Sequence, residues 1–280
     1  MPVRVVTDST CDLPASLAAE LGITVVPLSV VFGDEAPLLD GIDITPAVFY
    51  ERLKTSSRLP KTSQPSVEAF RAAYELAAAD GDEIVSIHVS SRLSGTLNSA
   101  SIAREDVAPE VHVELIDSYN VSVGLGAIVL EAAEAARAGR SRDEVVAAAR
   151  RTMDRVHVIC LLDTLEYLQR GGRIGRAQSM VGSLLNIKPI VHVEDGEIAA
   201  LQRVRTRAKA VERLRQLAIE DRTIRRLFVA SAGDDALAAS FAASVASELP
   251  HTDIRITQIG PVVGVHTGPG ALGICPVRRD

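Results

Sequence analysis

The 280-residue sequence contains few aromatic residues and few cysteines. Phenylalanine, tyrosine and tryptophan make up 3% of the chain, and tryptophan is absent. An internal cavity would therefore be lined mainly by aliphatic side chains, which suit a flexible aliphatic ligand better than a stacked base. A genome biased toward Ala and Arg is a simpler cause of the same composition. Cys11, Cys160 and Cys275 are far apart and odd in number, so no disulfide framework or metal-binding CxxC pair is expected.

Long apolar runs and an excess of positive charge are also missing. No stretch approaches the roughly 20 apolar residues that cross a bilayer, and residues 1–8 read as a strand rather than a signal segment. The net charge of −6 gives no long-range attraction for nucleic acid. We therefore expect a cytoplasmic protein with no integral membrane segment and no nucleic-acid partner.

Motifs of several enzyme classes are absent as well. The sequence has no GxxxxGK(S/T) loop, no HExxH and no GxSxG, and its six histidines show no metal-ligand spacing, so we expect neither a metal nor a cofactor. A literal GxGxxG spans Gly268 to Gly273, but only seven residues follow it and they read as a strand, which argues against dinucleotide binding. This pattern predicts a tight turn that presents His266 and Thr267 to a site; a histidine that is merely packed is the alternative.

The order of apolar and helical segments predicts an α/β fold with two domains. Through the first half, short β-branched runs alternate with amphipathic helices, as in βαβ units around a mainly parallel sheet. In the second half, Asp195-Gly196 indicates a hairpin, so the sheet there should be mixed. We predict an N-terminal α/β domain over residues 1–154 and a C-terminal α/β domain over residues 155–280, packed tightly around a shared cleft.

The elements expected within these domains are as follows. A capping box of Ser141 and Glu144 opens one helix. The other expected helices cover residues 14–20, 45–53, 67–79, 121–138, 165–169, 178–185, 208–219 and 236–249. The expected strands cover residues 3–6, 24–31, 83–88, 111–116, 156–161, 190–194, 197–204, 226–230, 253–259, 262–266 and 271–276.

A stretch rich in hydroxyl groups, Ser90 to Thr96, lies between the expected strand 83–88 and a helical segment. A strand that turns directly into a helix leaves the first N–H groups of the helix unpaired, so small hydroxyl residues and glycine there form a pocket for a phosphate or a carboxylate. Capping of the helix by Ser94 or Thr96 is the simpler alternative.

Two further clusters could contribute to the same site. In residues 61–66, Ser66 is a candidate N-cap for the following helix, whereas Thr62 and Ser63 are surplus to that role. Around Gly171-Gly172, Arg170 and Arg173 could form charge-assisted bonds to a carboxylate or phosphate, with a solvated loop as the alternative.

Six short blocks spread along the chain carry a family resemblance. They are Thr7-Asp8-Ser9-Thr10-Cys11-Asp12-Leu13-Pro14, Thr62-Ser63-Gln64-Pro65-Ser66, Leu93-Ser94-Gly95-Thr96 with Ser99-Ala100, Gly171-Gly172-Arg173-Ile174, Lys188-Pro189-Ile190 and His266-Thr267-Gly268-Pro269-Gly270-Ala271. With these blocks the chain resembles the DegV family of fatty-acid-binding proteins over nearly its whole length. Each block alone is weak, whereas six in the same order are highly specific.

The resemblance implies a lipid carrier rather than an enzyme. A member of this family would hold one long-chain fatty acid in a tunnel between two α/β domains. It would present the acid to a separate ATP-dependent fatty acid kinase, which forms an acyl-phosphate for phospholipid synthesis. The fatty acid would be the only ligand, with no catalytic residue in the carrier itself.

The resemblance also assigns site residues one by one. Thr62 and Ser94 would hydrogen-bond the carboxylate, with His266 and Arg173 nearby. The supporting head-group loop would consist of Ser63, Gly95, Thr96, Thr267 and Gly268. The basic residues Arg203 and Arg205 would dock the kinase, although their pattern also fits a solvated face. Arg92 and Leu97-Asn98 depart from the family pattern, which leaves the acyl preference open.

The residues also leave other functions open. Ser94 as nucleophile and His266 as base would make a hydrolase that acts on acyl esters, or the chain could be a small-molecule kinase. The missing nucleotide motif and the missing third triad member argue against both enzymes. A purely regulatory role through protein contacts is a third alternative.

Overall fold

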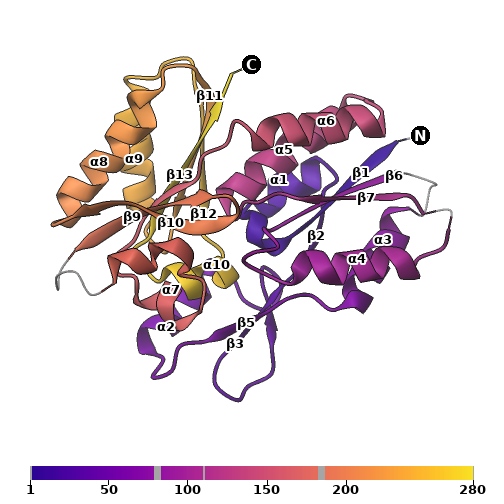
Figure 1. The fold of residues 1–280 in the computed structure, drawn as a ribbon, viewed down its shortest axis with the longest axis horizontal. Coiled ribbons are helices and arrows are strands. Elements are labelled where there is room, and N and C mark those ends of the chain that lie inside the picture. Colours follow the sequence, from indigo (N-terminus) through magenta and orange to yellow (C-terminus); the bar gives the residue numbers. More distant parts are fainter. Residues whose placement is uncertain (1, 79–82, 110, 182–186, 280) are drawn as a thin grey trace.

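Two sheets of different construction make up most of the protein (Figure 1). The computed structural model describes residues 2–78, 83–109, 111–181 and 187–279. The N-terminal part contains a four-stranded parallel sheet, and the C-terminal part contains a six-stranded mixed sheet. The predicted α/β class and both predicted sheet types are therefore confirmed, whereas the boundary between residues 154 and 155 stays a prediction.

The parallel sheet has the strand order β2-β1-β6-β7 and is covered on both faces. One face packs against α1, α5 and α6 and the other against α3 and α4, each through its own cluster of buried apolar side chains. Crossovers between parallel strands place helices on the sheet in this way. The strands are β1 (Val3–Asp8), β2 (Thr24–Val26), β6 (Glu83–His88) and β7 (Val113–Asp117); the helices are α1 (Ala15–Glu20), α3 (Val67–Ala77), α4 (Thr96–Asp106), α5 (Val123–Arg137) and α6 (Arg142–Met153).

The mixed sheet has the order β10-β9-β8-β13-β11-β12, and only β11 and β12 pair in parallel. Its outer face is covered by α8 and α9 (Figure 1), which bury Leu214 and Phe241 against it. The strands are β8 (Ile159–Leu161), β9 (Lys188–Glu194), β10 (Glu197–Val204), β11 (Ile224–Ser231), β12 (Asp253–Gln258) and β13 (Leu272–Arg278); the helices are α7 (Glu166–Arg170), α8 (Arg207–Glu220), α9 (Asp235–Ala246) and α10 (Pro261–Thr267), with a 3-10 helix, η2 (Gly175–Met180).

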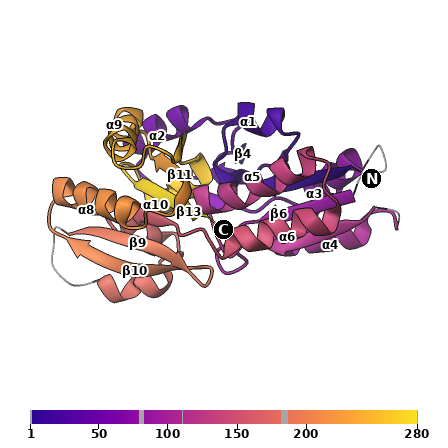
Figure 2. The same ribbon diagram turned by 90° about the horizontal axis from the view of Figure 1, so that it is seen from above.

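A third, small antiparallel sheet of order β4-β3-β5 lies against the junction of the two parts. Its strands are β3 (Ser29–Val31), β4 (Leu38–Leu39) and β5 (Lys61–Ser63), and α2 (Pro46–Thr55) belongs to the same region, as does the short 3-10 helix η1 (Ser9–Cys11). One cluster of buried apolar side chains joins this region to both parts, and it includes Phe49, Leu130, Phe228 and Val263. The two large sheets lie side by side along the molecule (Figure 2). A continuous core therefore fills the space between them.

Two local sequence signals are confirmed in detail. β9 and β10 form the expected hairpin, and Asp195 and Gly196 at its tip have φ angles of 51° and 78°, the left-handed conformation that such a two-residue turn requires. Ser141 and Glu144 form the expected capping box at the start of α6.

Two predicted elements were wrong, and a third lies partly outside the described residues. Residues 24–31 form two strands in different sheets, because Pro27 between them lacks an N–H for a ladder. Residues 262–266 belong to α10, not to a strand, because Pro261 at the first helical position outweighs the β-branched run. In the region predicted as helix 178–185, η2 ends at Met180, and residues 182–186 lie outside the described residues.

Across the described ranges, no helix has the length and apolar character needed to span a bilayer.

Arg226 joins the two parts by a charged contact. Its side chain is 8% exposed and lies on β11, where it pairs with Glu131 at 2.8 Å and Glu134 at 3.0 Å, both on α5, and with Asp253 of β12 at 2.8 Å. Removing this buried cation takes away the partner that three carboxylates share, which costs more than the loss of a surface ion pair, although Glu131 keeps Arg225 and Asp253 keeps Arg255.

We expect Arg226→Ala to lower the free energy of unfolding by about 3 kcal/mol. The neighbouring Arg225 also pairs with Glu131 but is 46% exposed, so Arg225→Ala is a matched control that should cost less than about 1 kcal/mol. Urea unfolding followed by circular dichroism measures both values. Equal losses in the two variants would contradict the assigned role of Arg226.

Candidate functional site

A cavity of about 290 Å³, here called the head cavity, opens where the two parts and the small sheet meet. Polar side chains from segments far apart in the chain line it together with aliphatic ones. The polar residues that line it are Thr10, Thr62, Ser63, Gln64, Ser94, Arg173, His266 and Thr267; the apolar ones are Leu28, Val89, Leu93, Val121, Leu168, Ile198, Val262 and Val263. The fold therefore brings together all four residues that were predicted to bind the carboxylate.

His266 and Thr62 form the central contact of the head cavity. His266 Nε2 lies 3.0 Å from Thr62 Oγ1, and burial, with a smaller contribution from Arg173, lowers the pKa of the imidazole to about 4. The ring is therefore neutral near pH 7. With its proton on Nε2, it donates to Thr62 and leaves the threonine O–H free to donate into the cavity. Such a hydroxyl can bind a carboxylate oxygen.

The backbone around His266 differs from the sequence prediction. His266 lies in the last turn of α10 rather than in a tight turn, and Thr267 donates back to Val263 O at 3.2 Å within that helix. Gly268 ends the helix with a φ of 74°, and a Cβ at this position would lie 2.3 Å from the Tyr167 ring. Gly171 also leaves room for a neighbouring ring, because a Cβ at this position would lie 2.3 Å from His266 Nδ1.

Ser94 lies just before α4, as predicted, and its hydroxyl contacts Thr96 Oγ1 at 2.8 Å. Thr96 N–H also donates to Ser94 Oγ at 3.3 Å. Ser94 therefore accepts a hydrogen bond from the first residue of α4 and also lines the cavity. Ser90, in contrast, donates to Gly196 O of the β9–β10 hairpin at 2.8 Å and is fully buried. Within the Ser90 to Thr96 stretch, Leu93 and Ser94 are therefore the residues that line the head cavity.

Gln64 fastens the small sheet to α4, a role that the sequence reasoning missed. Its Nε2 donates to Ser99 Oγ of α4 at 2.9 Å. A Cβ on Gly95 would lie 2.1 Å from Gln64 Oε1, so any other residue there would displace the Gln64 side chain from this position. Thr62 and Ser63 themselves lie on β5 rather than in a loop, and Thr62 pairs with Val30 of β3. The paired strand fixes the direction in which Thr62 points.

Arg173 supplies the cationic side chain of the head cavity. Its Nε donates to Leu93 O at 3.1 Å and its Nη1 to Gly171 O at 2.8 Å, which holds the guanidinium beside the cavity and leaves further N–H groups for an anion. Arg203 and Arg205 do not line this cavity. Arg203 lies on β10 and donates to Ser179 O at 2.7 Å, and Arg205 is exposed directly after that strand.

Two buried carboxyl groups hold α10 in place. Asp12 accepts from Gly260 N at 2.9 Å and from the Ser122 hydroxyl, and Asp40 accepts from Val262 N at 3.5 Å. Burial raises the pKa of Asp12 well above its ordinary value and raises that of Asp40 to about 7, and the nearby Asp8 raises both further. These bonds satisfy N–H groups at the start of the helix that carries His266.

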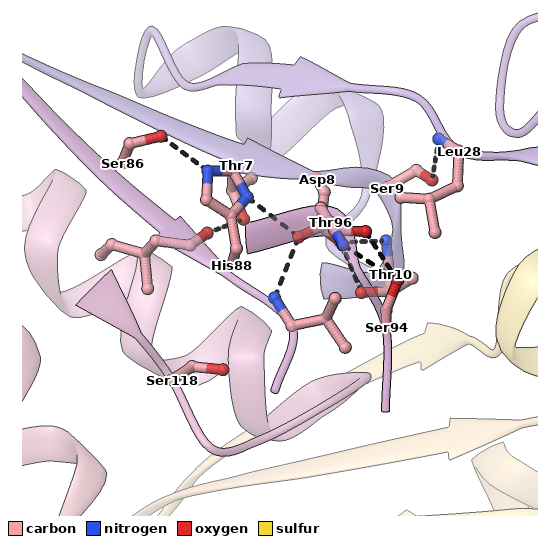
Figure 3. A network of polar contacts seen from close by, with 12 residues as sticks. Thr7, Asp8, Ser9, Thr10, Leu28, Ser86, His88, Ser94, Thr96 and Ser118 are labelled. Atoms are coloured by element: carbon pink, nitrogen blue, oxygen red, sulfur yellow. Dashed lines mark hydrogen bonds and ion pairs between the residues drawn. The ribbon is translucent and has the colours of Figure 1, made fainter. Parts of the chain in front are cut away.

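A second polar network lies behind Thr10 (Figure 3). His88 Nε2 lies 2.6 Å from Ser86 Oγ and His88 Nδ1 lies 3.0 Å from Asp8 Oδ2, the order of groups found in a Ser-His-Asp triad. Ser86, His88 and Asp8 are all fully buried, and Ser86 also contacts Tyr74 Oη at 2.9 Å. No substrate can reach this serine. The network instead fixes Asp8, which accepts from the backbone and hydroxyl of Thr10.

An inner cavity of about 50 Å³ adjoins the head cavity, and the atoms that face it are apolar. Five residues line both cavities, namely Val121, Leu168, Ile198, Val263 and Thr267. Beyond them the inner cavity is enclosed by residues of β8, β9 and β13 and by the start of α5. The combined space is polar at one end and apolar at the other.

Comparison with known proteins identifies the family. A model of uncharacterised proteins of the DegV family matches residues 2–279. The chain belongs to the DegV family. A DegV domain-containing protein of Streptomyces coelicolor is 40% identical over 286 residues, which cover 99% of each chain.

Two solved DegV family structures are closely similar to this one. The fatty-acid-binding DegV family protein of Thermus thermophilus is 36% identical with a TM-score of 0.91, and DegV of Bacillus subtilis, described as a fatty acid binding protein, is 35% identical with a TM-score of 0.92. Both comparisons cover 100% of this chain and 100% of the other. The family resemblance noted in the sequence is therefore confirmed.

The geometry of this DegV family member does not assemble the hydrolase alternative. Among the described residues, Ser94 bonds to Thr96 and His266 to Thr62, and His266 Nδ1 is buried with no hydrogen-bond partner. A catalytic base needs a group that orients this second ring nitrogen. Nor does any group of three or more His, Cys, Asp or Glu side chains suited to a metal ion occur within the described ranges.

We expect His266 to make the ligand-free protein less stable in acid. Because folding lowers its pKa, the unfolded chain binds a proton below about pH 6.5 that the folded protein does not. The stability present above pH 6.5 should therefore fall as the pH approaches 4, by up to about 3 kcal/mol. Asp12 and Asp40 act in the opposite direction, because their raised pKa values add stability as the pH falls. The loss due to His266 is therefore read from the difference in unfolding free energy between the wild type and a His266 variant, measured by urea unfolding at pH 7 and at pH 4.

His266→Asn should remove that pH dependence and leave the contributions of Asp12 and Asp40 in place. The surface variant His251→Asn controls for the loss of a histidine. If the difference in unfolding free energy between the wild type and His266→Asn stays constant from pH 7 to pH 4, the assignment of a neutral, buried imidazole is wrong.

Proposed function

We propose that this protein binds one long-chain fatty acid across the head and inner cavities and presents its carboxylate to a separate ATP-dependent fatty acid kinase. The observation that carries the proposal is the combined space of the two cavities, which has hydroxyl, imidazole and guanidinium groups at one end and apolar atoms at the other. The fatty-acid-binding Thermus and Bacillus proteins, at 36% and 35% identity, support the same ligand.

The two ends contribute differently to binding. Burial of the alkyl chain stabilises the complex by roughly 0.8 kcal/mol per methylene before ordering costs, so the tail supplies most of the affinity. The carboxylate loses its hydration and must be compensated by donors. Thr62, Ser94 and Arg173 are the donors available, with His266 directing the Thr62 hydroxyl. We propose Ser63, Gly95, Thr96, Thr267 and Gly268 as the residues that support them.

In the second step, a carboxylate oxygen bonds to the γ-phosphorus of ATP and ADP leaves, which yields the acyl-phosphate. This chain lacks the GxxxxGK(S/T) signature and a neutral histidine supplies no charge to a triphosphate, so we assign ATP to the kinase and only the positioning of the carboxylate to this protein. We propose that the carrier itself is non-enzymatic and that the pair acts in the cytoplasm, where ATP is available.

Native mass spectrometry of the protein purified from cells should detect one fatty acid per chain. Thr62→Val and Ser94→Ala should weaken binding of hexadecanoic acid by about ten- to a hundredfold, the value of one hydrogen bond to a charged group. The same variants should reduce acyl-phosphate formation, measured by phosphate transfer from ATP in the presence of the kinase, by a much larger factor. Thr24→Val on β2, outside the cavity lining, is the control.

Two outcomes would contradict the proposal. An empty protein that hydrolyses acyl esters unaided would favour the Ser94 and His266 hydrolase. Equal losses of lipid binding and of kinase turnover in the hydroxyl variants would show that these groups bind the ligand without positioning it.

For the kinase contact we propose Arg203 and Arg205, which lie near the end of β10 and are exposed. Arg203→Glu and Arg205→Glu should raise the concentration of carrier needed for half-maximal kinase turnover at least tenfold and leave fatty acid binding unchanged. Arg137→Glu, at an exposed arginine of α5, is the control for the change in net charge. An unaltered kinase response in all three variants would remove this surface from consideration.

A further inference from the structure

One wall of the inner cavity is a row of residues on a single face of the six-stranded sheet. Val191 of β9 lies directly opposite Cys160 of β8, Cys160 opposite Gly273 of β13, and Gly273 opposite Ala230 of β11. Directly opposed residues of neighbouring strands share a face. The first three line the inner cavity, and none of the row lines the head cavity. The row therefore lies at the end remote from the carboxylate site.

Gly273 has no side chain, so the middle of this wall carries no side-chain atoms. A Cβ built there would have its nearest neighbours, Cys160 Sγ, Ala230 O and Ile159 O, at 3.9 Å, which is an ordinary van der Waals contact. At Gly95 and Gly171, by contrast, a Cβ would come within 2.1 and 2.3 Å of a side chain. The fold would thus accept a side chain at position 273, and its absence adds space to the inner cavity.

Cys160, beside it, closes the wall with a small and uncharged group. Burial raises the pKa of the thiol to about 12, so it stays protonated at physiological pH. Its one described bond is a long contact of 3.7 Å with Leu161 O. A protonated thiol in such surroundings behaves as a small apolar side chain. Its size, together with the missing side chain of Gly273, sets how far the cavity extends.

We propose that Gly273 and Cys160 determine the maximum length of the acyl chain. The inference rests on the proposed function, because it requires the carboxylate to be held at Thr62 and Ser94. The alkyl chain then passes Val263, which lines both cavities, and its terminal methyl group contacts the wall at Gly273. A longer acid would need space that a close-packed sheet does not provide.

The test is a competition among saturated fatty acids. Delipidated protein is incubated with an equimolar mixture of the acids of 12, 14, 16, 18 and 20 carbons, and native mass spectrometry gives the distribution of bound acids. Gly273→Ala should raise the ratio of the next shorter acid to the acid preferred by the wild type at least about fourfold, the value of one methylene, and Gly273→Val should raise it further. Cys160→Ala should shift the distribution toward longer acids.

The neighbouring residue on β13 offers a matched control. Ile274 points to the opposite face of the sheet, where it packs in the cluster under α8 and α9, so Ile274→Val should leave the distribution unchanged. If Gly273→Ala and Cys160→Ala bind the acids with the wild-type distribution, the inference is overturned and the proposed function stands. If the wild type binds none of the acids, the proposed function fails and this inference fails with it. Should Gly273→Val not fold, the two alanine variants still decide.

Discussion

The position of α10 depends on two buried carboxyl groups of the N-terminal part, and the rest of the site depends on α10. Asp12 and Asp40 accept hydrogen bonds from backbone N–H groups at the start of this helix, which otherwise have no partner. Their raised pKa values reflect the cost of holding charge in the core, and hydrogen bonds offset part of that cost. Since His266 lies in the last turn of the helix, these distant carboxyl groups fix where the imidazole meets Thr62.

Among the described residues that line the head cavity, Arg173 is the one cationic side chain. Burial keeps His266 neutral, and two N–H groups of Arg173 donate to backbone carbonyls. Two glycines maintain this arrangement by close packing. The Gln64 side chain lies where a Cβ of residue 95 would be, and the His266 ring lies where a Cβ of residue 171 would be. An anion would therefore be held mainly by directed donors of limited strength, which suits a protein that must hold a group in one orientation and then release it.

Much of the fold was predictable because its signals are local. The Asp195-Gly196 turn and the Ser141 capping box act within a few residues, and both were confirmed. The errors arose where distant contacts decide. The run 262–266 is rich in β-branched residues, yet it is helical because Pro261 starts a helix that the buried carboxyl groups hold from another part of the chain. Asp12, Asp40 and Gln64 received no role from the sequence, because their partners lie between 35 and 248 residues away.

The sequence by itself determined the α/β class and the two kinds of sheet, and it named four of the residues that line the head cavity, Thr62, Ser94, Arg173 and His266, because periodicity, turn chemistry and the six DegV blocks are all present in the order of residues. Only the tertiary structure decided that Thr62 and His266 form one contact, that the imidazole is neutral, and that an apolar inner cavity continues the polar one. The physical reason is that burial and cross-strand register depend on segments that meet only in the folded chain. Val191, Cys160 and Gly273 are far apart in the sequence, and they form a row only because β9, β8 and β13 pair side by side.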